Sequence, residues 1–323
     1  MNKTNNYIDF SFIIPCYNVE KYVEDCIHSI TNQNFGDITY EILCIDDKST
    51  DKTLAILEKL ANENPCIKIH KNIINTGVSH SRNTGIKNAV GKWILFLDSD
   101  DLMMPNVIKQ IYKVAEENNA DAVALKALRV DENFKLDQAN NIDVNSGEIF
   151  ANCAISAVYN SKKLKEYNLL FNENISYGED TLFRGLFFYK SNVKIVSDIL
   201  WYLIRQNSAS LMKTKSKEKL KRTYFDSIII YEEYVANNLS QDVINHAKEG
   251  IALKLAQTMD KSFIKQQLHI LKTKKYYPYK FRKNTLLHSP NILIGLIQFL
   301  CPIKPCLWLY YKFYKTVRGK SYK

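Results

Sequence analysis

Five consecutive apolar residues, 93–97, lead directly into Asp98-Ser99-Asp100-Asp101. An apolar run without a polar face is typical of a strand that is buried on both sides of a sheet. In an open α/β sheet, ligands bind beyond the carboxyl ends of the strands, so these carboxylates stand where a bound substrate would lie. Two carboxylates separated by one residue suit Mg²⁺ or Mn²⁺. The plain alternative is a polar turn, in which Asp and Ser are common.

Strands and helices alternate along the first part of the chain. Apolar runs and helical spacing predict, in order, a strand at 10–14, a helix at 19–31, a strand at 40–45, a helix around 54–60, a strand at 67–69 and a helix at 78–89. Asn18 is expected to cap the first helix, and Gly91 is expected to end the third. Alternation of this kind is typical of right-handed βαβ units. We therefore expect an α/β fold with a Rossmann-like, mostly parallel central sheet flanked by helices.

The second predicted strand also ends in acids, because Asp46 and Asp47 follow it directly. Sequential elements are usually neighbours in a sheet, so this acidic end is expected to come close to the one at Asp98. The chain has no Gly-x-Gly-x-x-Gly after the first strand and no Gly-x-x-x-x-Gly-Lys-Ser/Thr motif. A dinucleotide-binding fold and a P-loop ATPase are therefore disfavoured.

Further elements follow the acidic run. They are a helix that begins near Pro105, a strand at 121–128, a long polar loop at 131–147, helices at 161–167 and 180–190, and strands at 193–196 and 199–204. Seven cysteines are scattered without the paired spacing of metal ligands, which fits a reducing cytosol. Residues 1–6 lack the apolar core of a signal peptide, so we expect the protein to stay inside the cell.

Charge divides the chain near residue 210. The net charge is +10, but residues 1–210 carry 22 basic and 27 acidic side chains, whereas residues 211–323 carry 22 basic and 7 acidic ones. We therefore expect two parts, a metal- and nucleotide-binding domain at 1–210 and a helical, basic carboxy-terminal extension at 211–323. The second part would be attracted to an anionic surface.

Five short segments, read together, resemble the family-2 glycosyltransferases that build bacterial capsular, lipopolysaccharide or teichoic glycans. They are Phe12-Ile13-Ile14-Pro15-Cys16-Tyr17-Asn18, Ile45-Asp46-Asp47-Lys48-Ser49-Thr50-Asp51, Gly77-Val78-Ser79-His80-Ser81-Arg82-Asn83-Thr84-Gly85, Leu97-Asp98-Ser99-Asp100-Asp101 and Gly178-Glu179-Asp180. Their order and spacing match the amino-terminal domain of that family over roughly residues 8–210, although Lys48 stands where the family usually has Gly. The resemblance implies a GT-A fold, a nucleotide-diphospho-sugar donor, most often a UDP-sugar, and an inverting transfer.

The resemblance also implies roles for the residues around the donor nucleotide. Pro15 and Tyr17 would line the base pocket, and the Asp46-Asp47 pair would hold the uracil edge. A site that satisfies a polar edge in this way rejects analogues that lack it. Arg82 would brace the acidic cluster, and its alternative is a place on a solvated helix face.

At the acidic run itself, Asp98 would approach the ribose or the sugar, and Asp100 would be the ligand of Mg²⁺ or Mn²⁺. The metal would neutralise the charge that develops on the departing diphosphate. Asp101 is expected to cap the turn toward Pro105.

An inverting displacement needs a base that removes the proton of the acceptor hydroxyl. The resemblance makes Asp180 the candidate, with Glu179 as its rival. The alternative for both acids is a helix start, where carboxylates are favoured by the helix dipole. Further on, Tyr202-Leu203-Ile204-Arg205 resembles the family's Tyr-x-x-Arg segment, so Arg205 would bind phosphate oxygens.

The carboxy-terminal region suits a membrane surface. Six Lys or Arg at 272–283 lie among aromatic residues, and an apolar stretch at 292–311 is interrupted by Pro302, Lys304 and Pro305. We expect it to lie at the inner face of the cell membrane, which would make this a cytoplasmic, peripheral protein. Packing on the catalytic domain or in a homo-oligomer is the alternative for this stretch. No RNA-binding motif accompanies it, so nucleic acid is not expected as a partner.

The leading hypothesis is therefore an inverting, metal-dependent glycosyltransferase that uses a nucleotide-sugar donor and a glycan acceptor, lipid-linked or free. A second hypothesis is a non-catalytic protein that binds a membrane surface or nucleic acid through its basic region. A third, a sugar nucleotidyltransferase, is disfavoured because the chain lacks a Gly- and Lys-rich triphosphate loop.

Overall fold

The computed structural model describes residues 8–134, 138, 149–150, 154–206, 216–245, 247, 251, 254 and 267. The chain divides into two compact units, residues 1–213 and residues 214–323. The first unit contains the sheet and all the candidate site residues named above.

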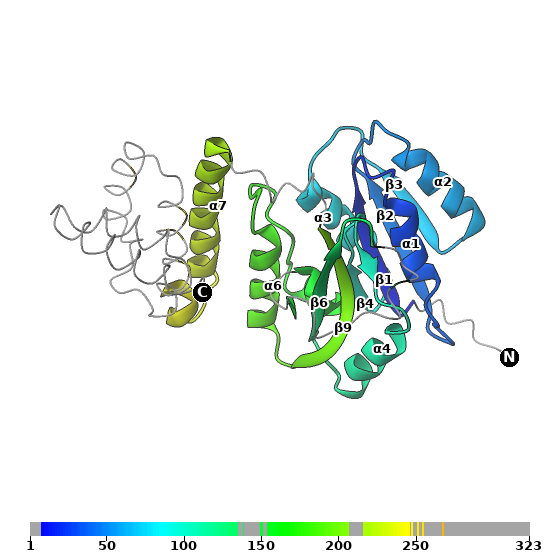
Figure 1. The fold of residues 1–323 in the computed structure, drawn as a ribbon. Coiled ribbons are helices and arrows are strands. Elements are labelled where there is room, and N and C mark those ends of the chain that lie inside the picture. The colour runs from blue at the N-terminus through cyan, green and yellow to red at the C-terminus, as the bar shows by residue number, and fades with distance from the viewer. Residues whose placement is uncertain are drawn as a thin grey trace, which may run out of the picture. The chain divides into compact units, whose positions relative to one another are not determined.

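A mixed sheet runs through the described part of the first unit in the strand order β3-β2-β1-β4-β8-β6-β9-β5, with β7 paired to β6 (Figure 1). The strands are β1 Phe10–Cys16, β2 Tyr40–Asp46, β3 Ile67–Lys71, β4 Trp93–Phe96, β5 Leu102–Met103, β6 Ala122–Asp131, β7 Ile149–Phe150, β8 Ala157–Asn160 and β9 Lys194–Gln206. The half made of β3, β2, β1 and β4 is parallel throughout. Beyond β4, the pair β6–β9 is parallel, and β8, β5 and β7 run antiparallel to their neighbours. The expected α/β fold is confirmed.

Helices cover both faces of this sheet. The helices of the first unit are α1 Val23–Thr31, α2 Thr53–Glu63, α3 Val78–Asn88, α4 Ile108–Glu117, α5 Ser161–Glu166 and α6 Glu179–Lys190, with a 3₁₀ turn at Ala154–Ser156. The first two crossovers move outward from β1 to β3, and the third returns past β1 to β4. Because such crossovers are right-handed, α1 and α2 lie on one face and α3 lies on the other.

A close contact fixes α3 on the sheet. Gly85 of α3 lies against Ile13 of β1, and a Cβ at this position would stand 2.3 Å from Ile13 Cγ2. Ile13 is in register with Phe96 of β4, so both side chains point to the same face. Phe96 in turn packs edge-on against Phe183 of α6, with ring centroids 5.6 Å apart. Consequently α3 and α6 share one face of the sheet (Figure 1).

Three expectations from the sequence are corrected by this fold. Helix α1 begins at Val23 rather than at residue 19, and Asn18 does not cap it. Asn18 instead has a φ of 52°, and its side chain accepts a hydrogen bond from the Thr50 N–H.

Gly91 does not cap α3, because this helix ends at Asn88. A Cβ at Gly91 would stand 2.5 Å from the Ser11 nitrogen, so glycine is required there for close approach to β1. The two strands predicted at 193–196 and 199–204 are the single strand β9, whose pairing with β6 contains a register irregularity at Lys126.

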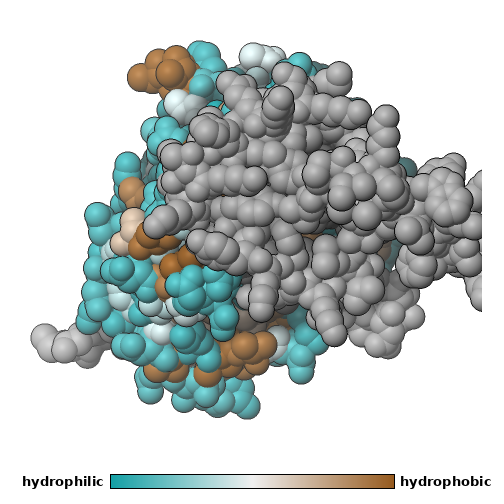
Figure 2. Space-filling view, turned by 90° about the vertical axis from the view of Figure 1, so that its left-hand side faces the viewer, coloured by the Kyte–Doolittle hydropathy of each residue, from teal (hydrophilic) through white to brown (hydrophobic). Residues whose placement is uncertain are grey.

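The described part of the second unit contains helix α7, Lys217–Ala236. Ser216 caps its start by accepting from the Lys219 N–H, and Tyr224, Tyr231 and Ile251 form a small buried cluster. None of the helices in the described residues has the length and apolar character needed to cross a bilayer. On the face shown in Figure 2, the described surface is mainly hydrophilic with separate hydrophobic patches. The expected membrane-binding stretches at 272–283 and 292–311 lie outside the described residues.

Candidate active site

The acidic ends of β2 and β4 lie on either side of β1 at one edge of the sheet. Asp46, the last residue of β2, is in register with Cys16, the last residue of β1. Asp98 follows β4 after Leu97, whose N–H donates to the Ile13 carbonyl at 3.1 Å. One strand separates the two acidic ends, which corresponds to about 10 Å at the usual strand spacing. The helices change face between β1 and β4, which is where ligands bind in open α/β sheets.

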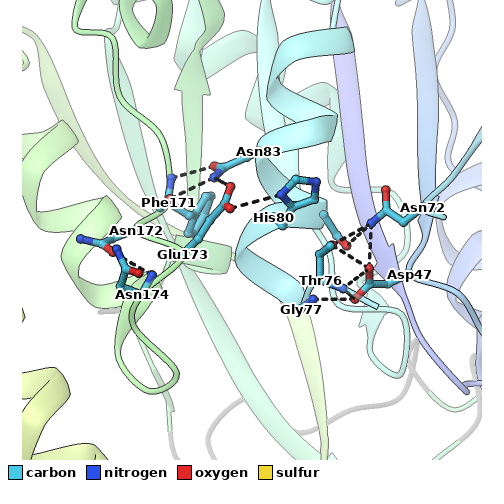
Figure 3. Close-up of polar contacts among 11 residues, drawn as sticks. Asp47, Asn72, Thr76, Gly77, His80, Asn83, Phe171, Asn172, Glu173 and Asn174 are labelled. Carbon is cyan, nitrogen blue, oxygen red and sulfur yellow. Dashed lines mark hydrogen bonds and ion pairs between the residues drawn. The ribbon is translucent and has the colours of Figure 1, made fainter. Parts of the chain in front are cut away.

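Asp47 is fully engaged with the start of α3. Its carboxylate accepts hydrogen bonds from the side chains of Asn72 and Thr76 and from the backbone N–H groups of Thr76 and Gly77, at 2.7–3.2 Å (Figure 3). Burial acts to raise the pKa of Asp47, but these donors outweigh it and lower the pKa. Asp47 therefore fixes the loop between β3 and α3 as an ionised carboxylate.

Asp46 differs from its neighbour because one of its oxygens is unused. Its side chain is buried, with the residue 3 % exposed, and Oδ2 accepts only a long bond of 3.3 Å from the Ser49 N–H. Among the described residues, Oδ1 has no hydrogen-bond partner. A buried carboxylate oxygen without a partner is costly unless a ligand supplies a donor. Asp46 is thus the member of the pair that can accept from a bound base.

The loop after β1 lies against the loop after β2. Pro15 is buried in β1, and Tyr17 beyond it is 47 % exposed. The Val19 N–H donates to Thr53 Oγ1 at 2.8 Å, and Asn18 Oδ1 accepts from Thr50. Tyr17 is therefore presented at the same edge of the sheet as Asp46, on a loop that is fastened at its base.

Arg82 joins the end of β4 to the start of α6. Its guanidinium donates to Asp98 Oδ1 at 2.8 Å and to Glu179 Oε1 at 3.0 Å, and its side chain is only 5 % exposed. Burial acts to lower the pKa of this guanidinium, but the two carboxylates outweigh burial and raise it. Arg82 was expected to brace the acidic cluster, and the structure brings it together with Asp98 and with one of the two candidate bases.

Tyr202 of β9 orders the acidic run from its other side. The Asp98 N–H donates to the Tyr202 hydroxyl at 2.9 Å, and that hydroxyl donates to Asp101 Oδ2 at 2.8 Å. Asp101 also accepts from the Arg205 N–H at 2.7 Å. Burial, and then the charges of Asp100 and Asp98, raise the pKa of Asp101 well above its usual value. Asp101 thus bonds to β9 rather than to the turn near Pro105, so the expected cap is corrected.

Arg205 lies behind the acidic run. Its guanidinium donates to Asp25 Oδ2 at 2.8 Å, to the Phe134 carbonyl at 3.2 Å and to the Asp100 carbonyl at 3.4 Å. The side chain is 1 % exposed and stacks near the Tyr22 ring. These contacts fix the backbone of Asp100, and binding of phosphate oxygens by Arg205 stays a prediction.

The carboxylates at this edge fit a divalent cation that is shared with a substrate. In the described part of the chain, no three His, Cys, Asp or Glu side chains are grouped as a protein cage for a metal. Mg²⁺ usually binds one or two carboxylates and completes its shell with phosphate oxygens and water. Asp98 is paired with Arg82 and Asp101 with Tyr202, and Asp100 is half-buried between them in the sequence. The role of Asp100 as the metal ligand stays a prediction.

Glu179 and Asp180 open α6, after Gly178 at a φ of 92°. Glu179 is the ion-pair partner of Arg82; burial raises its pKa although the Arg82 charge acts to lower it. Asp180 is half-buried and accepts from the Thr181 N–H at 2.7 Å. Of the two acids, Asp180 is therefore the one whose carboxylate is not committed to Arg82. Its role as the base stays a prediction.

Two residues of this region escaped the sequence analysis. Tyr202 and Asn83 both lie inside the segments quoted above, but neither stood out, because a tyrosine on a strand and an asparagine on a helix are ordinary surface or core residues. Only the fold places the Tyr202 hydroxyl between Asp98 and Asp101, and Asn83 beside the segment that precedes α6.

Known proteins resemble this chain over the same part. Residues 11–180 match the model of glycosyl transferase family 2. The poly(ribitol-phosphate) beta-N-acetylglucosaminyltransferase TarS of Staphylococcus aureus is 28% identical over 212 residues, which cover 64% of this chain and 37% of TarS. The uncharacterized glycosyltransferase EpsJ of Bacillus subtilis is 31% identical over 247 residues, covering 69% of this chain and 70% of EpsJ.

The fold is shared as well. The crystal structure of S. aureus TarS 1-349 in complex with UDP-GlcNAc has a TM-score of 0.65 and 21% identity, over 98% of this chain and 93% of that chain. By sequence, this chain spans little more than a third of full-length TarS. The matched residues 11–180 include both acidic strand ends, Arg82 and the start of α6, and the chain belongs to glycosyl transferase family 2.

Proposed function

We propose that the chain is an inverting, metal-dependent glycosyltransferase that moves a sugar from a UDP-sugar to a hydroxyl of a cell-envelope glycan. The observation that carries this proposal is the position of Arg82, whose guanidinium bonds to Asp98 beside the expected metal ligand and to Glu179 beside the expected base. In an inverting transfer, the leaving group and the base must lie on opposite faces of the same sugar carbon. The buried guanidinium of Arg82 bonds to one carboxylate on each side, Asp98 and Glu179.

The relatives suggest the substrates. TarS is named for transfer of N-acetylglucosamine to poly(ribitol phosphate), and its structure holds UDP-GlcNAc. UDP-GlcNAc is therefore the first donor to test, and a teichoic-type polyol-phosphate polymer, lipid-linked or free, is the first acceptor class. Asp46 Oδ1 would accept from the uracil N–H, and Pro15 and Tyr17 would flank the base.

In the mechanism that we propose, the residues of the chain divide the work. Asp100 would hold Mg²⁺ or Mn²⁺, and the bound cation would supply neutralisation of the charge on the diphosphate leaving group. Asp98, held by Arg82, orients the ribose or sugar of the donor. Asp180 takes the proton of the acceptor hydroxyl as that oxygen bonds to the anomeric carbon from the face opposite the diphosphate. The bond between the anomeric carbon and the diphosphate oxygen breaks, and UDP leaves.

The cellular place of the reaction is part of the proposal. A lipid-linked acceptor would be reached at the inner face of the cell membrane, and the basic excess of residues 211–323 would favour anionic lipid. Sedimentation of the full chain with phosphatidylglycerol vesicles, and not with phosphatidylcholine vesicles, is the expected result. Equal binding to both would remove the electrostatic part of this proposal.

A donor screen tests the proposed function. Hydrolysis of UDP-, GDP- and dTDP-sugars is measured with and without Mn²⁺, together with calorimetric titration of UDP. Mn²⁺-dependent binding of UDP and turnover of a UDP-sugar are expected. A protein that acts only through its basic region would bind UDP with no dependence on the metal, and that outcome would contradict the proposal.

A further inference from the structure

We infer that Asn83 of α3 is a positioning residue for the segment 171–180, which carries Asp180. The inference rests on the proposed function, because Asp180 is the base only if the chain transfers a sugar. Asn83 had no role in the sequence analysis, and its expected effect is on the transfer step. Figure 3 shows the contacts of Asn83 with Phe171 and Glu173 that support this inference.

Asn83 bonds to the backbone of Phe171 as a strand neighbour would. Its amide nitrogen donates to the Phe171 carbonyl at 2.9 Å, and its amide oxygen accepts from the Phe171 N–H at 2.8 Å. Asn83 is 2 % exposed, so both bonds are shielded from water. Removing a partner from such a bond leaves a buried backbone group unsatisfied, which costs about 1–3 kcal/mol. The start of the segment is therefore fixed to α3.

The Phe171 ring strengthens this attachment. It stacks on Phe183 of α6 with centroids 4.0 Å apart and an interplanar angle of 2°, and it meets Phe96 of β4 edge-on at 5.2 Å. The Arg82 guanidinium lies 5.2 Å from the same ring centroid. Phe171 thus has contacts with the sheet and with both helices of this face. The Asn83 amide fixes the position of the Phe171 backbone relative to α3.

Glu173 extends the attachment by two residues. Its carboxylate accepts from the Asn83 amide at 2.8 Å and lies 3.2 Å from His80 Nδ1 (Figure 3). The Asn83 hydrogen bond is the main reason that the pKa of Glu173 is lowered, with burial acting the other way. A single amide of α3 therefore bonds to both Phe171 and Glu173.

The other end of the segment is held by the preceding residue of the same helix. Arg82 bonds to Glu179, and Asp180 follows directly. Two consecutive residues of α3 therefore hold the two ends of 171–179, and Asp47 holds the beginning of α3 through Thr76 and Gly77. In this way α3 connects the pocket expected for the uracil ring with Asp180, the proposed general base.

The two residues should differ in what they control. Arg82 contacts Asp98 on the donor side, so its loss affects donor binding and turnover together. Among the described residues, the Asn83 side chain hydrogen-bonds only to Phe171 and Glu173, so its loss should shift Asp180 and leave the donor pocket in place. A displacement of about 1 Å in a reacting group can reduce a rate on the order of a hundredfold.

The experiment compares Asn83→Asp with Asn88→Asp. Asn88 is on the same helix and is exposed, and in the described part of the chain its side chain donates a hydrogen bond only to the Thr84 carbonyl, so it is a matched control. An aspartate at 83 cannot donate to the Phe171 carbonyl and repels Glu173. Hydrolysis of UDP-GlcNAc with Mn²⁺ should then show kcat lowered by about tenfold or more, with the Kd of UDP changed by less than about twofold. The control should match the unaltered protein.

A second substitution gives a rescue. In the double variant Asn83→Asp with Glu173→Gln, the new glutamine amide donates to the new aspartate and removes the repulsion between two carboxylates. Part of kcat should return, which a general loss of folding would not allow. If Asn83→Asp does not fold, Glu173→Ala takes its place, because this side chain is 46% exposed and should lower kcat alone.

Hydrogen exchange of residues 171–178 gives a readout without turnover. Exchange should be faster in Asn83→Asp and unchanged in Asn88→Asp. Faster exchange with unchanged kcat would overturn the inference, as would a loss of UDP affinity equal to the loss of kcat. If the unaltered protein neither binds UDP nor turns over any donor, the proposed function fails, and the catalytic part of this inference fails with it.

Discussion

The guanidinium of Arg82 lies 3.0 Å from the carboxylate of Glu179, across the space between α3 and the start of α6. The same guanidinium lies 2.8 Å from Asp98. One buried cation therefore sets the distance between the acidic run after β4 and the two acids that open α6. In a displacement at a sugar carbon, that distance must match the span between the leaving group and the acceptor hydroxyl.

Replacing Arg82 by methionine should be strongly destabilising. The substitution leaves two carboxylates without their buried cation, and breaking one side of such a pair costs about 3–5 kcal/mol. The midpoint of urea unfolding measures this loss. Lys87→Met, on an exposed position of the same helix, is the control and should change the midpoint little. A midpoint for Arg82→Met equal to that of the control would mean that the ion pairs do not hold the site.

Asp100→Asn and Asp180→Asn should separate metal binding from proton removal. Asp100→Asn should abolish the Mn²⁺ dependence of UDP binding in a folded protein. Asp180→Asn should keep UDP affinity and lower turnover by about 10²–10⁴, the usual contribution of a general base. Calorimetry and donor hydrolysis measure the two effects. Retained turnover in Asp180→Asn would move the base to Glu179 or to another group.

Tyr202→Phe should loosen the acidic run. The change removes the hydroxyl that accepts from the Asp98 N–H and donates to Asp101, leaving two buried polar groups unsatisfied. We expect a loss of about 1–3 kcal/mol in the free energy of unfolding and weaker Mn²⁺-dependent UDP binding. The matched control is Tyr189→Phe on α6, whose side chain is 44 % exposed. Identical UDP affinity in both variants would show that Tyr202 stabilises the fold without ordering the site.

The parallel half of the fold and its acidic edge could be predicted from the sequence because both depend on local signals. The apolar runs at β1, β2 and β4 are buried in full or nearly so, and acids follow two of them. The nearness of the two acidic strand ends was expected because sequential elements are usually neighbours in a sheet. The strand order itself, in which the chain returns from β3 past β1 to β4, was not predicted. The position of β9 did not follow, because Ser197 and Asp198 resemble a turn and only its pairing with β6 makes it one strand.

Which carboxylate does what could not be predicted from spacing alone. Asp46 and Asp47 are adjacent in the sequence, yet Asp47 is bonded to the start of α3 and Asp46 has an unused oxygen. The difference comes from donors in the loop between β3 and α3, at separations of 25–30 residues. Such long-range partners leave no periodic signal in the sequence. The same reason applies to Asn83, whose partners lie 88–90 residues away.

Asp47 should make stability fall in acid. Its pKa is lowered in the folded protein, so its contribution is complete above the unfolded value of about 3.9 and is lost as pH falls through the lower, folded value. Asp47→Asn should be less stable than the unaltered protein at pH 7, and the difference should shrink toward pH 2–3. Urea unfolding over that range measures it, with the exposed Asp37→Asn as control. A constant difference at all pH values would contradict the ionised role of Asp47.

Lys48→Gly should stabilise the protein. Lys48 is exposed and has a φ of 64°, in the left-handed region, where a side chain costs about 1–2 kcal/mol relative to glycine. Part of this gain is offset because glycine makes the unfolded chain more flexible, so we expect a net increase of roughly 0.5–1 kcal/mol in the free energy of unfolding. Lys52→Gly is the matched control, because Lys52 has a φ of −80° and gains no relief from strain. Urea unfolding of the two variants should give shifts of opposite sign. A loss of stability in Lys48→Gly as large as in the control would show that the Lys48 backbone is not strained in solution.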